Sequence, residues 1–434
     1  MVQTNYHPQS FAERLIYYSL LSTWVLWLIG GLYIAGPVIA WILAGNVAWR
    51  FYLAPGLPEH QKPKKAGWVL WTWVAGMALL LVTLWIGHSN FDLGMVATIK
   101  SSIGWAKGWA LLAIFILAGA ALDIRPAIIY RAICKLGAQT LILLPIFLIA
   151  PFAGLPETLY VSPLQIVGGP GPEYFATTLY TIEPGAGVPR WQFFAPWSPA
   201  AGMVAMVYVI CAIEEKQLKW KLVGISAGLI VALLSQSRLA LVALAVVWPM
   251  AFAISRVNKP AIWFAAAPVL LGASLFSVNI VQNVAEVQSE FESARADSSR
   301  VRAALGRIAV HRWQEEAPWF GHGVVERGPH LVEYMMIGSH HSWYGLLFVK
   351  GIIGLLALAI PMALSLFLLA QKACRYPEAR VGLSLLLLLL LYSFGENLEI
   401  LAYLYWPALI LIGNGLRLRF PIIPESDKQS RPAT

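Results

Sequence analysis

The sequence predicts an all-α, polytopic membrane protein with about twelve transmembrane helices. Hydrophobic residues make up 59% of its 434 positions. Charged residues make up only 12%, against about 25% in an ordinary soluble domain. The hydrophobic residues occur in long runs, and a bilayer core of roughly 30 Å requires about 20 apolar residues per helix. These observations exclude a normal soluble surface.

The hydrophobic runs divide the whole chain, residues 1–434, into the spans of a single transmembrane domain. Helices are predicted because unpaired backbone groups in hydrocarbon are too costly for other open structures. The N-terminal residues lack the features of a secretory signal, so the first run is expected to remain. The predicted spans lie near residues 14–30, 33–53, 67–87, 104–122, 129–152, 197–214, 219–236, 238–256, 261–279, 342–370, 379–395 and 400–416.

The positions of Lys and Arg predict the orientation, because short cytoplasmic loops collect these residues. With both termini inside, most of the 31 basic residues fall in the interior loops and tails, and every interior loop receives at least two. The opposite orientation fails at nearly every loop. Both termini are therefore predicted to be cytoplasmic.

Three external segments hold most of the remaining basic residues. Residues 153–196 are rich in Gly and Pro and include the sequence GGPGPE. A short turn follows at Ser235–Arg238. Residues 279–341 are too polar for the bilayer, and the part from Arg300 to Trp313 lacks Pro and predicts an amphipathic helix. The chain is thus expected to carry a long external loop with a helix in it.

Arginines are concentrated in the stretch ESARADSSRVRAALGRIAVHRW of the long loop. Helical spacing places Arg300, Ala304, Arg307 and His311 along one face. Guanidinium groups bind phosphate oxygens in a planar, bidentate manner, so this face suits a diphosphate at the membrane surface. The alternative is a surface helix that is solvated or lies on anionic lipid headgroups.

Two further arginines lie close to predicted spans. Arg238, in LLSQSRLALVAL, has no polar loop around it, and an arginine at such depth requires a partner. It could instead be an anchor whose charged end reaches the interface. Arg190, in VPRWQFFAPW, lies beside aromatic residues, and interfacial anchoring is an equal alternative.

Histidines and acidic residues complete the candidate cluster. His340 and His341 open the predicted span at 342–370, and a neutral imidazole can accept a proton from an attacking hydroxyl. They could also be interfacial hydrogen-bonding residues. Glu396, between the last two spans, could orient a histidine, grip a sugar hydroxyl or lie in an exposed turn. The spacing of the external histidines matches no standard zinc pattern, so no metal site is predicted.

The order of several short motifs resembles the O-antigen ligase and polysaccharide polymerase superfamily. These motifs are S-x-S-R between two helices, an arginine followed by a P-x-(F/L)-G-x-G turn, and H-(N/S)-x-Y opening a helix that continues G-(I/L)-I-G-L. The resemblance covers roughly residues 185–400. The matching residues are Ser235–Arg238, Arg300, Pro318, Phe320, Gly321, Gly323, His341, Ser342, Tyr344 and Gly351–Leu355.

The resemblance implies a GT-C-like glycosyltransferase of the bacterial inner membrane, with periplasmic loops at 153–196 and 279–341. It implies transfer of an undecaprenyl diphosphate-linked O-antigen glycan to a sugar hydroxyl of the lipid A core, with inversion. No metal or other cofactor and no nucleic acid is expected, whereas membrane lipids are expected partners. Related enzymes with other acceptors, namely polysaccharide polymerases and protein O-oligosaccharyltransferases, remain open alternatives. A lipid or polysaccharide transporter is the alternative of a different class, although the predicted spans are nearly free of ionisable residues.

The same resemblance assigns roles to individual residues. His341 resembles the general base that takes the acceptor proton. Glu396 and His340 are candidates for orienting a group or binding the acceptor. The residues that look like diphosphate-binding groups are Arg190, Arg238 and Arg300, with Arg302 and Arg307 as second choices.

Overall fold

The structure is a computed structural model that describes residues 6–58, 62, 64, 67–183, 187–260, 262–264, 267–268, 271, 296–339 and 341–418. Most of these residues are helical. The helices are α1 (Phe11–Leu21), α2 (Thr23–Leu28), α3 (Leu32–Leu53), α4 (Trp68–Asn90), α5 (Met95–Lys107), α6 (Trp109–Ala121), α7 (Pro126–Ile149), α8 (Ser198–Ile213), α9 (Leu218–Leu234), α10 (Arg238–Ile254), α13 (Ala296–Glu316), α14 (Ser342–Ala373), α15 (Pro377–Ser393) and α16 (Leu398–Arg417).

Short antiparallel strand pairs interrupt the otherwise helical chain. They are β1 (Thr158–Val161) with β2 (Ala176–Thr178), β3 (Thr181–Ile182) with β4 (Pro189–Arg190), and β5 (Glu326–Arg327) with β6 (Met336–Ile337). The first two pairs lie in the Gly- and Pro-rich segment at 153–196, and the third follows α13. The helical class is therefore confirmed, with small strand pairs that the sequence did not predict.

Six helical segments in the described part of the chain are long and apolar enough to cross a membrane. These segments are Leu32–Gly56, Trp68–Asn90, Met95–Ala121, Pro126–Ile149, Ser342–Ala373 and Leu398–Arg417. The span predicted at 14–30 is instead divided into α1 and α2, because the backbone leaves helical geometry at Ser22, where φ is −87° and ψ is 2°. The span predicted at 261–279 lies mostly outside the described residues.

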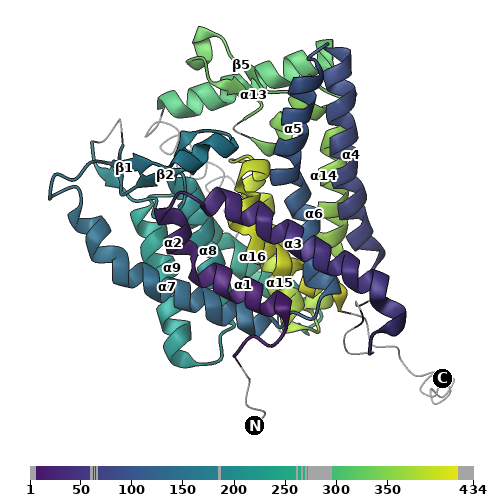
Figure 1. Cartoon of the computed structure of the whole chain (residues 1–434). Coiled ribbons are helices and arrows are strands. Elements are labelled where there is room, and N and C mark those ends of the chain that lie inside the picture. Colours follow the sequence, from purple (N-terminus) through teal and green to yellow (C-terminus); the bar gives the residue numbers. More distant parts are fainter. Residues whose placement is uncertain are drawn as a thin grey trace.

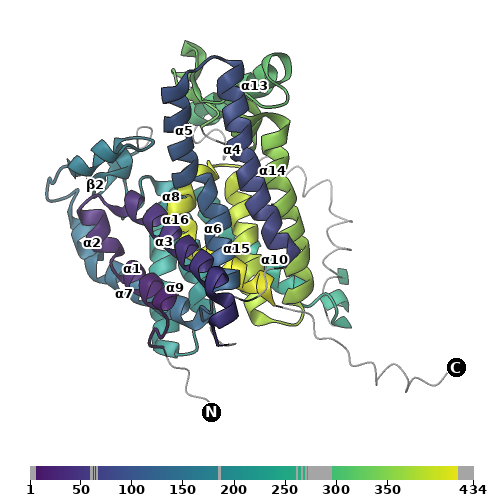
Figure 2. The same cartoon turned by 45° about the vertical axis from the view of Figure 1, so that its right-hand side comes forward.

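Helix α16 forms the centre of the bundle and packs closely against α6 (Figures 1 and 2). A Cβ atom on Gly119 would lie 2.0 Å from the Ile410 carbonyl oxygen, and one on Gly413 would lie 2.0 Å from the Ile116 carbonyl oxygen. Small residues allow such backbone contact between helices, which increases their van der Waals packing. The two reciprocal glycines therefore fix the spacing of α6 and α16.

Polar contacts tie together the loops at one end of the bundle. The start of α1 joins the start of α7 through Glu13 and Arg125, whose closest atoms are 2.7 Å apart. The end of α8 joins α15 through Glu214 and Arg380 at 2.8 Å. Helix α13 lies at the opposite end (Figures 1 and 2), and β5 lies beside it (Figure 1). The predicted interior loops joined by these contacts thus share one end, far from α13.

Helix α14 is broken near its beginning, and a loop fills the break. Gly351 has φ 66° and ψ −170°, a conformation that favours glycine. The loop at residues 318–323 approaches this point with Gly321 also at positive φ, 68°. Four backbone hydrogen bonds join the two segments, from His322 N to Phe348 O, Gly323 N to Val349 O, Ile352 N to Pro318 O and Ile353 N to Trp319 O. The P-W-F-G-H-G motif therefore satisfies backbone groups that the break exposes.

Candidate functional site

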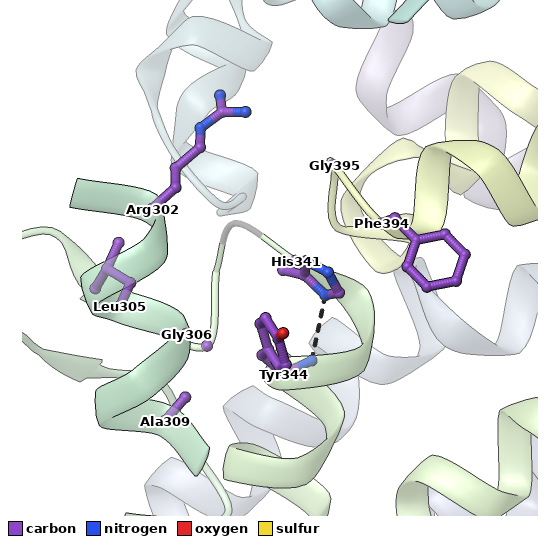
Figure 3. A pocket seen from close by; sticks show the side chains of 10 residues that line it. Arg302, Leu305, Gly306, Ala309, His341, Tyr344, Phe394 and Gly395 are labelled. Carbon is purple, nitrogen blue, oxygen red and sulfur yellow. Dashed lines mark hydrogen bonds between the residues drawn. The ribbon is translucent and has the colours of Figure 1, made fainter. Parts of the chain in front are cut away.

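A pocket of about 90 Å³ lies between α13, the start of α14 and the loop that precedes α16 (Figure 3). The lining side chains and backbone come from Arg302, Leu305, Gly306, Ala309, Gly338, His341, Tyr344, Gly345, Phe394 and Gly395. Three segments that are far apart in the sequence thus form one concave site.

His341 caps the N-terminus of α14 with its side chain. Its Nδ1 atom accepts hydrogen bonds from the backbone N–H group of Trp343 at 3.2 Å and from that of Tyr344 at 3.3 Å, and Figure 3 shows the second of these. Burial lowers the pKa of His341 below its usual value, which favours the neutral ring. A neutral imidazole carries one hydrogen, and because Nδ1 is an acceptor here, that hydrogen lies on Nε2.

Tyr344 holds the His341 ring from one side. The two rings are stacked, with their centroids 4.2 Å apart. The Tyr344 ring lies close to α13, where a Cβ on Gly306 would be 2.9 Å from its Cδ2 atom. The absence of a side chain at Gly306 therefore allows α13 to approach the start of α14.

Arg302 is the pocket arginine on α13. The helix is oriented by a stripe of small and apolar residues that packs against β6 and α14, namely Val301, Ala304, Leu305 and Ala309 with Val332, Ile337 and Phe348. Arg300 and Arg307 lie roughly 160° and 140° around the helix from Arg302, at about 100° per residue. Both are exposed, and neither lines the pocket. The predicted face of Arg300, Ala304, Arg307 and His311 is therefore not the pocket face.

Glu396 lies just behind the pocket wall formed by Phe394 and Gly395. It is 8% exposed, and its Oε2 accepts a hydrogen bond from the indole of Trp197 at 3.1 Å. Burial raises the pKa of Glu396 to about 7, although the charge of Arg302 and the bond from Trp197 oppose this shift. The carboxyl group is thus poised to exchange a proton near neutral pH.

The start of α10, which follows the turn at 235–238, packs against the same wall. Arg238 is the first residue of α10, and its neighbour Leu239 would be 3.3 Å from a Cβ on Gly395. Arg190 reaches this turn from β4, since its Nη2 donates to the Ser235 carbonyl oxygen at 3.4 Å. Arg190 also forms an ion pair with Glu183. The structure therefore brings Arg190 beside the turn that contains Arg238. The guanidinium of Arg190 is already paired with the carboxylate of Glu183.

Apart from Arg190 and Arg238, the predicted site residues divide into three groups. Arg302 and His341 line one pocket, and Glu396 adjoins it. Arg300 and Arg307 lie on the other side of α13, whereas His340 lies outside the described residues. Across the described parts of the chain, no group of three His, Cys, Asp or Glu side chains could hold a metal ion.

Two neighbours of the site were not predicted as site residues. Tyr344 stands in the H-S-x-Y motif, which could have identified it. Trp197 lies in an aromatic-rich stretch without a distinctive motif, and only the fold brings it to Glu396.

A segment of the chain that contributes most of the pocket residues matches a model of a known protein family. Residues 223–359 match a protein-family model described as O-antigen ligase. The matched segment contains Arg238, Arg302 and His341, and ends before Glu396. No curated protein matches the chain.

Proposed function

From the O-antigen ligase family domain that residues 223–359 carry, we propose that this protein transfers a lipid-linked glycan to a sugar hydroxyl of the lipid A core. The donor is an undecaprenyl diphosphate-linked O-antigen glycan. The observation that carries the proposal is the meeting of Arg302 and His341 in one small pocket beside the turn of Arg238. The pocket holds the reacting groups, while the polyprenyl chain and the glycan extend beyond it.

Arginine side chains supply the electrostatic part of this reaction. A diphosphate becomes a good leaving group when its developing charge is compensated, and preorganised cationic donors provide that compensation in a partly dry site. Arg302 lines the pocket, and Arg238 begins the helix packed against its wall. We assign these two arginines to the diphosphate, with Arg190 as a more distant contributor.

The charge distribution supports a periplasmic site. The loops rich in Lys and Arg meet at the end of the bundle opposite α13, and cytoplasmic loops are enriched in these residues. We therefore propose a bacterial inner-membrane protein with cytoplasmic termini and a GT-C-like arrangement of about twelve spans. Helices α8, α9, α10 and α15 also cross the bilayer, which gives ten of these spans among the described residues. Donor and acceptor lipids reach the pocket from the bilayer.

A reconstituted transfer assay tests this function. Purified protein is mixed with undecaprenyl diphosphate-linked glycan and lipid A core, with and without a chelator, and the products are separated by size. Glycan-capped lipid A core at equal yield in both reactions is the expected result. Movement of the donor lipid across vesicles without transfer would overturn the proposal in favour of a transporter.

A deletion strain distinguishes a ligase from the related polymerases. Loss of the ligase leaves the complete polymer on its lipid carrier, and the lipopolysaccharide remains uncapped. Accumulation of single repeat units on the carrier would instead identify a polymerase.

A further inference from the structure

A groove of about 640 Å³ lies between the first helices and shares no residue with the pocket of His341. One wall is a face of α1 and α2, and the other is a face of α3. The lining residues are Phe11, Arg14, Leu15, Tyr18, Ser19, Ser22, Leu26, Ala35, Val38, Ile39 and Ile42. Most of them recur at intervals of three or four residues, so each wall is a continuous helical face.

The groove faces outward from the bundle. Its α3 wall belongs to Leu32–Gly56, a segment long and apolar enough to cross a membrane. Helices α1 and α3 both lie on the outside of the bundle (Figures 1 and 2). Tyr18, Val38 and Ile42 are between 40% and 58% exposed. An exposed apolar groove marks an interaction site, and within a bilayer the apolar partner at hand is a lipid acyl chain.

The dimensions of the walls fit one such chain. At 1.5 Å per residue, the lining extends roughly 20 Å along α1 and α2, from Phe11 to Leu26, and roughly 10 Å along α3, from Ala35 to Ile42. Each leaflet contributes half of a hydrocarbon core of roughly 30 Å, so one acyl chain extends about 15 Å. The two walls therefore bracket the length of a single lipid chain.

Arg14 supplies the charge in this otherwise uncharged lining. Its side chain is exposed, and no carboxylate of a described residue pairs with its guanidinium. The neighbouring Glu13 is engaged elsewhere, since it is buried and its carboxylate accepts a hydrogen bond from Arg125 at 2.7 Å. Arg14 lies near the start of α1, at the end of the bundle opposite α13. A cation at the end of an apolar groove is complementary to a phosphate, which a guanidinium binds in a planar, bidentate manner.

We propose that this groove binds one anionic phospholipid of the membrane, with its phosphate on the Arg14 guanidinium and one acyl chain between the faces of α1–α2 and α3. The bound chain fills the space between the two faces and stabilises their packing. The pocket of His341 lies beside α13, at the other end of the bundle, so the lipid site is separate from the glycosyl transfer proposed above.

Thermal melting of the purified protein in mild detergent tests the ligand. Phosphatidylglycerol should raise the melting temperature more than phosphatidylcholine with the same chains, because a ligand that binds the folded state stabilises it in proportion to its affinity. Inorganic phosphate at the same concentration should have no effect, since it lacks the chain. Native mass spectrometry should show one phosphatidylglycerol retained per protein. Equal effects of the two lipids, or an equal shift with inorganic phosphate alone, would overturn the proposal.

An exchange at Arg14 tests the contact with the headgroup. Arg14→Gln should bind phosphatidylglycerol about fivefold more weakly and lose the preference for it over phosphatidylcholine. Lys216→Gln is the matched control, because it removes one positive charge from an exposed position between α8 and α9 at the same end of the bundle. It should bind both lipids as wild type does. A similar loss in the two variants would show a response to overall charge and contradict the role of Arg14.

A bulky side chain in the groove tests where the acyl chain lies. Val38 lines the groove, whereas Val25 in α2 does not, and both are exposed, so each accepts a larger side chain without repacking of the core. Val38→Trp should reduce the retention of both lipids at least about fivefold, and Val25→Trp should retain them as wild type does. If Val38→Trp retained phosphatidylglycerol fully, the lipid would bind elsewhere and the assignment of the groove would be wrong.

Discussion

The hydroxyl of Ser342 donates a hydrogen bond to the Glu396 carbonyl oxygen at 2.7 Å. The same hydroxyl accepts from the backbone N–H of Leu398 at 3.0 Å. Ser342 is only 1% exposed, so no solvent competes for these contacts. The first residue of α14 is thereby fixed to the loop before α16, which sets the relative positions of His341 and Glu396.

Replacing Ser342 by alanine should weaken both the fold and the reaction. The Leu398 N–H would lose its buried partner, at a cost of about 1–3 kcal/mol. We expect a lower melting temperature in detergent and a slower transfer, because the Glu396 loop would shift relative to His341. Ser339→Ala is the control, since Ser339 bonds an exposed turn at Met336 O, and it should behave as wild type. Equal melting temperatures for the two variants would contradict the role of Ser342.

Arg302 and Arg307 form a matched pair on α13. Arg302→Ala should weaken donor binding or transfer by about 10- to 100-fold, the value of one hydrogen bond between charged groups. Arg307→Ala removes the same charge from the opposite side of the helix and should change the rate by less than about threefold. Donor titration in the transfer assay measures both. A larger loss for Arg307→Ala would show that the diphosphate lies elsewhere.

Gly351 should not tolerate a side chain. Alanine would be strained at φ 66°, and its Cβ would lie 2.3 Å from the Trp319 carbonyl carbon. We expect a loss of at least about 2 kcal/mol of stability, or failure to accumulate in the membrane. Gly45 is the control glycine, because a Cβ there meets no atom within 4 Å. Thermal melting in detergent should show Gly45→Ala at or slightly above wild type.

His322 should contribute to stability, whereas His311 should not. The buried His322 ring contacts the Phe348 carbonyl oxygen at 3.0 Å and the Glu316 carboxylate at 2.8 Å, and stacks on Phe348. His322→Ala should therefore lower the free energy of unfolding by about 3 kcal/mol. His311 is 68% exposed and pairs with Glu315 over one turn of α13, so His311→Ala should change it by less than about 0.5 kcal/mol. Similar melting temperatures would contradict this distinction.

Acid should weaken the attachment of α13 through Glu316. Hydrogen bonds from Arg312 lower the pKa of Glu316 to about 2 from 4.5. A carboxylate whose pKa is lower in the folded state stabilises the fold above about pH 4.5, and this contribution disappears as the pH falls toward 2. Glu316→Gln should therefore show a smaller drop in melting temperature between pH 5 and pH 3 than wild type. The effect will be modest because the side chain is 41% exposed.

Apolar runs predicted the main helices well, since α3, α4 and α14 begin and end within a few residues of the expected spans. The breaks were not predictable in the same way. Ser22 does not interrupt the apolar run that contains it, and the break at Gly351 is accompanied by hydrogen bonds from the distant loop at 318–323. Local hydropathy does not report a conformation that depends on a distant partner.

The candidate site shows the same contrast between residues that local sequence predicts and contacts that depend on the folded chain. His341 was predicted from its motif, and the structure places it at the pocket. Arg300 and Arg307 are both exposed, whereas Ala304, which spacing placed on the same face, is buried, because helical spacing alone could not tell which side of α13 faces the protein. The side is determined by Val332, Ile337 and Phe348, which are distant in sequence from these arginines. The proximity of Trp197 to Glu396 likewise requires the folded chain.

The break in α14 also determines how this protein could be recombined with its relatives. Residues 296–353 contain α13, the loop that fills the break and the segment that receives it, so they form one exchangeable cassette. A chimera joined at residue 330 would combine the loop at 318–323 from one parent with the broken helix α14 from the other parent. Crossover points before 296 and after 353 keep the two halves of this joint together.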